Sequence, residues 1–179
     1  MALGFFINSE KCYGCQTGQV ACKCQQNTSP GVNLRVVTEF NENEPRSLAT
    51  LSMSCNHCEN PVCLTSCPVD AYSKLPSGIV LQDHDLCTGC RICIEVCPYN
   101  APQYDPADGK VTKCSYCVER FVRGLAPRCV DACPGGYLVS GTMEHLSSLY
   151  EGVQEIPGVT PEASLTKPSI IINPARPHK

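Results

Sequence analysis

The chain lacks tryptophan, is poor in other aromatic residues, and has no long hydrophobic run. Its longest apolar stretch, SIIIN at 169–173, is far shorter than the roughly 18–20 apolar residues of a membrane span. The net charge is -3 and no basic patch stands out, which argues against binding to nucleic acid. We therefore expect no direct membrane span and no nucleic-acid partner.

The start of the chain also lacks the features of a secretory signal. MALGFFINSEK has no basic n-region, no long apolar core and no small-residue cleavage site. The expected location is therefore cytoplasmic or membrane-associated. Because the cytosol is reducing, the 16 cysteines are not expected to form disulfides.

Cysteine is what the chain has in excess, and it falls into four groups of four: Cys12, Cys15, Cys22 and Cys24; Cys55, Cys58, Cys63 and Cys67; Cys87, Cys90, Cys93 and Cys97; and Cys114, Cys117, Cys129 and Cys133. The last three groups each end in Cys-Pro. The third group matches the bacterial ferredoxin run C-x2-C-x2-C-x3-C-P. The second and fourth groups follow the same pattern with a longer middle gap.

This spacing suits a cubane iron–sulfur cluster. Two intervening residues let a tight loop place successive sulfurs on neighbouring corners of one cube, and the fourth cysteine, one helical turn further, points to another cluster. The proline then ends the local pattern. A tetrahedral zinc site has no use for the third and fourth cysteines of such a run, so iron–sulfur is favoured over zinc or disulfides. Colour would discriminate, since iron–sulfur protein is brown.

The crossover of the fourth ligand predicts how four clusters share the cysteines. The third and second groups form one pair, and the fourth and first groups form another around it. The expected ligand sets are Cys87, Cys90, Cys93 and Cys67; Cys55, Cys58, Cys63 and Cys97; Cys114, Cys117, Cys129 and Cys22; and Cys12, Cys15 and Cys133.

The last set is one ligand short, because Gly18 stands where a third cysteine is expected. Three outcomes remain open for this cluster. It is altered, as a [3Fe-4S] cluster or a four-iron cluster with water or another group on that corner; Cys24 substitutes; or the cluster is absent. On a continuous helix Cys24 faces about 200 degrees from Cys22, which is compatible with Cys24 serving a different cluster from Cys22. It also lies about 9 Å beyond residue 18, which is too far unless the helix is broken, so the altered cluster is favoured.

The motifs carry a family resemblance. GFFINSEKCYGC, SCNHCENPVCLTSCP, DLCTGCRICIEVCPYNAPQYD and KCSYCVERFVRGLAPRCVDACP resemble the four-cluster iron–sulfur (beta) subunit of the molybdopterin oxidoreductase, or dimethyl sulfoxide reductase, family, over roughly residues 3–175. The resemblance implies a non-catalytic subunit that relays single electrons between a quinol-linked membrane-anchor subunit and the molybdenum or tungsten cofactor of a large catalytic subunit. It also implies that a signal-bearing partner could export the folded complex.

Two other classes of function remain open: a free soluble multi-cluster ferredoxin, and a maturation or redox-sensing protein. About 45 residues follow Cys133 and about 30 separate the first two groups, and such non-ligating segments suit a permanent interface. Co-purification with a large subunit would decide. No Ser/His/Asp set or carboxylate pair stands in a catalytic setting, so no catalytic residue is expected.

The predicted fold is α+β, with two ferredoxin-like halves of the bacterial 2[4Fe-4S] type and little regular secondary structure. We expect one cluster-binding unit over 1–179, with an inner half at 52–104, an outer half from 1–30 plus 105–150, and an interface tail at 151–179. Strands are expected at 4–8, 32–40, 78–83 and 110–114, helices at 117–124 and 142–150, and coil at 151–167. In 32–40, Val32, Leu34 and Val36 alternate with partly polar neighbours. Without clusters the protein should be largely unfolded.

Two polar residues beside the motifs are not expected to be ligands. His57 lies between Cys55 and Cys58, a group that already has four cysteines, so it is interpreted as a neighbour of the cluster or a surface residue. Lys113 precedes Cys114 and could hydrogen-bond a cluster or contact a partner, but a solvated charge is the more common case.

Overall fold

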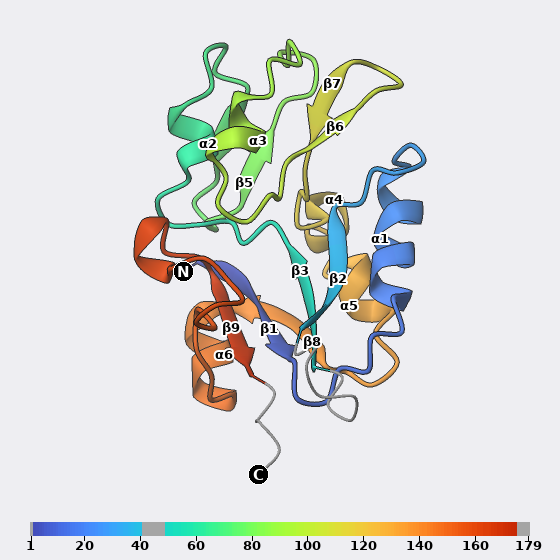
Figure 1. The fold of residues 1–179 in the computed structure, drawn as a ribbon, viewed down its shortest axis with the longest axis vertical. Coiled ribbons are helices and arrows are strands. Elements are labelled where there is room, and N and C mark those ends of the chain that lie inside the picture. Colours follow the sequence, from blue (N-terminus) through green and yellow to red (C-terminus); the bar gives the residue numbers. More distant parts are fainter. Residues whose placement is uncertain (1, 41–48, 175–179) are drawn as a thin grey trace.

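The computed structural model describes residues 2–40 and 49–174 (Figure 1). Short strands and short helices alternate along the chain, which makes it an α+β protein of the kind expected. The strands are β1 (Leu3–Asn8), β2 (Arg35–Phe40), β3 (Ala49–Ser54), β4 (Tyr72–Lys74), β5 (Val80–Gln82), β6 (Gln103–Asp105), β7 (Lys110–Thr112), β8 (Leu138–Thr142) and β9 (Ile170–Asn173). The helices are α1 (Thr17–Gln26), α2 (Val62–Thr65), α3 (Ile92–Val96), α4 (Val118–Phe121), α5 (Arg128–Asp131), α6 (Met143–Leu149) and the 3-10 turn η1 (Ala163–Leu165).

A three-stranded sheet at the bottom of Figure 1 brings both ends of the described chain together. β1 lies in its centre, antiparallel to β8 and parallel to β9. Because β1 is covered on both faces, its run LGFFIN is apolar throughout rather than alternating. Helix α6 packs on this sheet and begins at Thr142, whose hydroxyl accepts a hydrogen bond from the His145 N–H at 3.2 Å.

A second layer lies beside the sheet, at the right of Figure 1. It consists of the β2–β3 hairpin and of helices α1, α4 and α5, with α1 packed on α5 and on β2. The main hydrophobic core lies between this layer and β1, and Phe5, Ile7 and Tyr116 are fully buried in it.

The top of Figure 1 holds two small hairpins, β4–β5 and β6–β7, together with α2 and α3. Each of these two helices follows a group of cysteines and precedes one of the hairpins. Their apolar contacts form a separate small core around Val80, Val111 and Tyr72.

The secondary structure differs from expectation in particular places. The expected strands and helices are present, but the strands β3, β4, β6, β8 and β9 and the helices α1, α2, α3 and α5 were not assigned from the sequence. In β2 the alternation is misleading, because Val36 is exposed whereas Arg35 is buried. The segment 151–167 is irregular, as expected, apart from an isolated bridge at Val153 and the short turn of η1. Residues 175–179 of the expected tail lie outside the described residues.

Candidate metal centres

The four Cys-x-x-Cys loops share one backbone feature. The residue just before the second cysteine has a positive φ in every loop: Gly14 (70°), His57 (45°), Gly89 (71°) and Tyr116 (59°). Glycine adopts this left-handed conformation freely, whereas His and Tyr adopt it at a cost that their buried contacts must offset. The four loops therefore turn in the same way, although only two of them carry glycine.

The short helices after these loops also repeat. The third cysteine of a group is the second residue of its helix in three cases: Cys63 in α2, Cys93 in α3 and Cys129 in α5. In α1 the second residue is Gly18. The structure thus places Gly18 where the other three helices carry a thiol, as the spacing predicted.

The three Cys-Pro segments end in equivalent turns. Three residues after Cys67, Cys97 and Cys133 the backbone N–H donates to the carbonyl of that cysteine, at 3.5, 3.1 and 3.2 Å. The donors are Asp70, Asn100 and Gly136, and all three have a positive φ. Aspartate, asparagine and glycine tolerate this conformation best, so the turn chemistry fits the sequence.

These repeated loops and helices bring the thiols together in four groups. Each group is called a cage and is named after a residue or structural feature beside it. The hairpin cage holds Cys67, Cys87, Cys90 and Cys93; the lysine cage holds Cys55, Cys58, Cys63 and Cys97; the arginine cage holds Cys22, Cys114, Cys117 and Cys129; and the open cage holds Cys12, Cys15 and Cys133 with Gly18.

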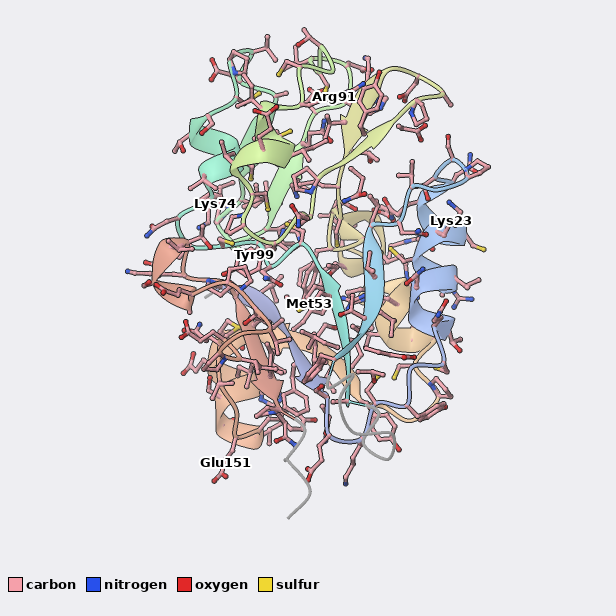
Figure 2. All side chains as sticks on the ribbon, in the orientation of Figure 1. Lys23, Met53, Lys74, Arg91, Tyr99 and Glu151 are labelled. Atoms are coloured by element: carbon pink, nitrogen blue, oxygen red, sulfur yellow. The ribbon has the colours of Figure 1, made fainter. Side chains whose placement is uncertain are left out.

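The hairpin cage lies at the top of the molecule. A small cavity is lined by its four thiols and by Pro68, Tyr72 and Val111. The Val111 N–H donates to Cys87 Sγ and the Ala71 N–H to Cys67 Sγ, both at 3.4 Å. Arg91 is exposed beside it, with its guanidinium 3.6 Å from the centre of the Tyr104 ring (Figure 2).

The lysine cage surrounds a small cavity. Its lining joins distant parts of the chain, because Thr166 from the last fifth of the sequence donates its hydroxyl to Cys58 Sγ at 3.2 Å. Tyr99, which Figure 2 places between the upper hairpins and the lower sheet, lies 3.4 Å from the same hydroxyl. Burial raises the pKa of Cys58 to about 11 and that of Cys63 to about 12.

Two residues of this lining decide between the alternatives that the sequence left open. Lys113 is 5 % exposed, so it is a buried cation and not a solvated one. Its ammonium donates to the carbonyls of Val80 and, at 2.9 Å, of Cys114. His57 is also buried, and its Nδ1 accepts the Val80 N–H at 3.1 Å. Burial and the Lys113 charge hold the pKa of His57 well below its usual value, so it is neutral and not on the surface.

The arginine cage is the most buried. All four of its thiols are buried, and Cys22 and Cys129 belong to the main hydrophobic core. Burial raises the pKa of Cys22 to about 12, and the neighbouring Cys129 and Cys117 contribute to the rise. The Tyr116 N–H donates to Cys114 Sγ at 3.4 Å.

The open cage has a small cavity lined by its three thiols, Gly18 and Gln16. Its ligands are the least buried, since Cys15 is exposed and Cys12 and Cys133 are half-buried. The Thr17 hydroxyl donates to Cys15 Sγ at 3.3 Å, and this hydrogen bond is the main reason that the pKa of Cys15 is lowered.

Cys24 does not line this cavity. Helix α1 is continuous from Thr17 to Gln26, so Cys22 and Cys24 lie about 200 degrees apart around its axis. Accordingly Cys22 is buried and Cys24 is exposed. The condition under which Cys24 could reach the open corner, a broken helix, is not met.

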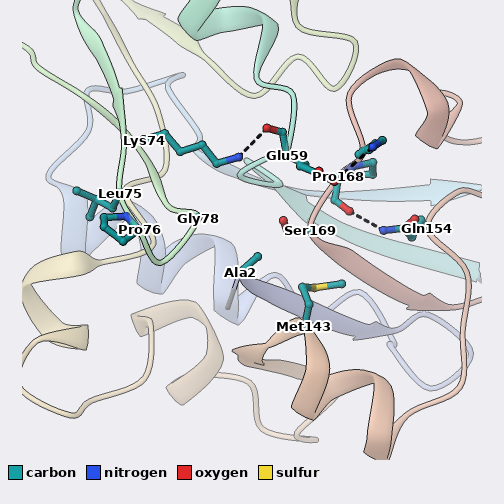
Figure 3. A pocket seen from close by; sticks show the side chains of 11 residues that line it. Ala2, Glu59, Lys74, Leu75, Pro76, Gly78, Met143, Gln154, Pro168 and Ser169 are labelled. Atoms are coloured by element: carbon teal, nitrogen blue, oxygen red, sulfur yellow. Dashed lines mark hydrogen bonds and ion pairs between the residues drawn. The ribbon is translucent and has the colours of Figure 1, made fainter.

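The donor set fits iron–sulfur clusters. Thiols from different loops surround enclosed spaces of similar size, while no three His, Cys, Asp or Glu side chains within 2–40 and 49–174 come together closely enough to hold a single metal ion. Another hollow lies between Lys74, Glu59, Met143 and Gln154 (Figure 3), but it is open and no cysteine lines it.

Comparisons with known proteins agree with this donor set. A family model described as a 4Fe-4S dicluster domain matches residues 47–143. The B component of the anaerobic dimethyl sulfoxide reductase of Escherichia coli strain K12 is 38% identical, over 96% of this chain and 88% of that protein. The protein belongs to the family of iron–sulfur subunits of dimethyl sulfoxide reductase.

Two further relatives are named for a tetrathionate reductase and for a hydrogenase operon. The B component of the tetrathionate reductase of Salmonella typhimurium is 34% identical over 77% of this chain and 57% of that protein. The hydrogenase-2 operon protein HybA of Escherichia coli O157:H7 is 36% identical over 81% of this chain and 53% of that protein. The protein is therefore a non-catalytic electron-transfer subunit of a multi-subunit oxidoreductase and carries several iron–sulfur clusters. None of the helices in the described part of the chain has the length and apolar composition of a membrane span.

Proposed function

We propose that this subunit holds four iron–sulfur clusters, one in each cage, and that they form its electron path. The observation that carries the proposal is the exchange of the fourth thiol. Cys97 follows α3 but lines the lysine cage, whereas Cys67 follows α2 but lines the hairpin cage. Cys133 and Cys22 are exchanged in the same way between the open and arginine cages. When bound, such clusters supply one-electron redox chemistry at potentials set by their surroundings.

The exchange also supports a division into two ferredoxin-like halves. Residues 52–104 contain both members of the first pair of cages, and residues 1–30 with 105–150 contain the second pair. In this proposal the halves meet where Cys55 packs beside Cys114, so the lysine and arginine cages are the two inner stations of the path. The hairpin and open cages are then the two ends.

The proposed partners are a large subunit with a molybdenum or tungsten pterin cofactor and a membrane-anchor subunit linked to quinol. Two ends of one path require two partners, and the relatives are reductase subunits. The alternative of a free ferredoxin is less well supported, because residues 151–165 expose Val153, Val159 and Leu165 in a segment that holds no thiol. We assign this exposed part of the tail to the interface. A signal-bearing partner would decide on which side of the membrane the complex works.

At the open cage we propose a cluster that lacks a protein ligand at one corner. The corner faces Gly18, and Cys24 lies on the other side of α1. The cluster is then [3Fe-4S], or [4Fe-4S] with water or the Gln16 amide at the fourth iron. The remaining three cages each offer four thiols and fit [4Fe-4S] clusters.

Iron analysis and EPR of the full chain, isolated anaerobically with its partners, test this function. We expect three reducible four-iron clusters and one further signal from the open cage. A zinc-containing colourless protein would refute the cluster assignment. A brown protein that isolates alone, with no large subunit in the same extract, would instead favour the free ferredoxin.

A further inference from the structure

Arg35 is the most unusual charged residue of the molecule. It is 1 % exposed and lies at the start of β2, with Cβ to guanidinium inside the main core. Its Nη1 donates to the Ser52 carbonyl at 2.7 Å and its Nη2 to the Ser54 hydroxyl at 2.8 Å, while Nε has no hydrogen-bond partner in the described residues. All these acceptors are neutral.

No carboxylate forms an ion pair with Arg35 within residues 2–40 and 49–174. Burying an uncompensated cation is strongly unfavourable, so something anionic must face it. The Phe5 ring lies against the guanidinium, 5.0 Å from its carbon to the ring centre, and the anion-forming groups around it are the thiols of Cys129, Cys114 and Cys22, three members of the arginine cage. A guanidinium stays protonated in proteins, so the positive charge is kept.

Lys113 repeats this arrangement at the neighbouring cage. It lines the lysine cage, and its charge lowers the pKa of Cys63 and Cys97 against the larger effect of burial. Its hydrogen bonds go to backbone carbonyls, which require a donor and accept an ammonium. Within the described residues it has no carboxylate ion pair either.

We propose that Arg35 and Lys113 are the buried counter-charges of the two inner clusters, and that each raises the reduction potential of the cluster in its own cage. Cysteine ligation leaves a cluster anionic, and reduction by one electron adds one more negative charge to the cage. A fixed cation beside it favours the reduced state, because water is not there to screen the interaction. The inference rests on the proposed ligand sets and adds two positioning residues to them.

The outer cages have no buried cation of their own. The aliphatic stem of Arg35 comes near the open cage, since its Cδ lies 3.8 Å from where a Cβ at Gly18 would stand, but its guanidinium is bound by Ser52 and Ser54. The other cations near the outer cages are exposed, as Arg91 is in the lining of the hairpin cage and Lys11 is beside Cys12. Water and salt screen exposed charges, so their effect on a cluster is small. The inner stations of the path are therefore the ones whose potentials depend on single buried side chains.

Redox titration of the full chain, followed by EPR, tests the proposal with Arg35→Met and Lys113→Met. Each variant should make one midpoint potential more negative, and the two variants should affect different clusters. We expect the ratio of reduced to oxidised cluster at a given potential to fall by about tenfold or more, which corresponds to a shift of about 59 mV or more. Arg123→Met is the matched control, because it removes an exposed positive charge and should leave all potentials unchanged.

Variants that conserve the charge keep the test decisive if a methionine variant fails to bind its iron–sulfur cluster. Arg35→Lys and Lys113→Arg should load iron and keep potentials close to those of the unaltered protein. If Arg35→Lys also fails to load, shape and not charge is what the arginine cage requires, and the inference is wrong. Iron analysis distinguishes failure of the proposed function from failure of this inference. An unaltered protein whose cages hold no clusters would refute the proposed function. Methionine variants that bind all their iron and keep unchanged potentials would refute only the counter-charge role of Arg35 and Lys113.

Discussion

The arginine cage and the open cage are built from the same pieces and are exposed very differently. Both have a left-handed Cys-x-x-Cys loop and a short helix, and they exchange one thiol with each other. The arginine cage buries all four thiols in the main core, whereas the open cage has an exposed Cys15 and no thiol at position 18. The same local motif is therefore a buried site within the core in the arginine cage, and a solvent-accessible site at one end of the proposed electron path in the open cage.

Electrostatics follow the same division. Burial raises the pKa of every thiol for which the arginine cage shows a shift, and Arg35 compensates the charge of the bound state. In the open cage a single threonine hydroxyl is the main influence on Cys15, and its effect on the pKa is opposite in sign. A ligand lost from the arginine cage therefore leaves an uncompensated cation in the core, whereas a ligand lost from the open cage is replaced by water.

The largest effect is expected when a ligand is removed from each cage in turn. Cys114→Ala should abolish loading of the arginine cage and leave little folded protein, because structural metal sites contribute on the order of 10 kcal/mol to small folds. Cys15→Ala should lose only the open-cage cluster and keep the other three. Iron content of the protein and thermal unfolding measure both outcomes. Equal loss of fold in the two variants would contradict the division into a core site and a terminal site.

A second test makes the open cage resemble the closed ones. A Cβ at Gly18 would lie 3.2 Å from the Cys129 carbonyl oxygen and 3.8 Å from Arg35 Cδ, so a side chain needs a shift of a few tenths of an ångström. We expect Gly18→Cys to fold and to complete the fourth corner. EPR of the oxidised protein should then lose any three-iron signal.

Gly18→Ser is the matched control, since serine has a similar size and a weaker ligand atom. It should show whether adding a side chain at position 18 disturbs the open cage through packing alone, without a new thiol ligand. If Gly18→Cys leaves an existing three-iron signal unchanged, position 18 does not face the corner, and the assignment of the open cage fails.

A smaller effect on cluster potential is expected when a threonine hydroxyl that donates to a thiol is removed, one in the buried lysine cage and one in the open cage. Thr166 is buried and donates to Cys58, whereas Thr17 is exposed and donates to Cys15. Thr166→Val should make the lysine-cage potential more negative by roughly 40 mV, since a neutral hydrogen bond contributes on the order of 1 kcal/mol. Thr17→Val should change its cluster less, because water replaces the hydroxyl.

Midpoint potentials from a redox titration give both values. Valine keeps the branched shape of threonine, so packing changes little in either variant. A larger shift for Thr17→Val than for Thr166→Val would show that exposure does not control how strongly these clusters respond to their surroundings.

Local spacing was enough to predict much of the site. A tight loop and one helical turn fix where neighbouring thiols lie, so Cys63, Cys93 and Cys129 could be placed before their helices were seen. The position of Gly18 followed from the same spacing. One strand of each hairpin, β5 and β7, was also predicted, because each is a short apolar run beside turn residues, whereas the partner strands β4 and β6 were not.

What could not be predicted depends on contacts between distant segments. The sequence makes Arg35 look like a polar residue of an alternating strand, and only the packing of β2 against β3 and α1 shows that it is buried. Thr166 reaches Cys58 across 108 residues, which no local pattern signals. His57 and Tyr116 adopt a conformation that glycine usually takes, so the loops CNHC and CSYC did not look like CYGC and CTGC. A lysine is usually exposed to solvent, but Lys113 is buried, and nothing in the local sequence indicates this.

The smallest effect is expected at Cys24, the sixteenth cysteine. It is exposed on α1, on the side of the helix away from Cys22, and no cavity lined by the other thiols includes it. Cys24→Ala should therefore leave the iron content, the EPR spectra and the potentials unchanged, and alanine should keep the helix intact. Cys22→Ala, two residues earlier on the same helix, is the contrasting variant and should lose the arginine-cage cluster. If Cys24→Ala instead creates a three-iron signal, Cys24 was the fourth ligand of the open cage, and the helix must unwind when that cluster binds.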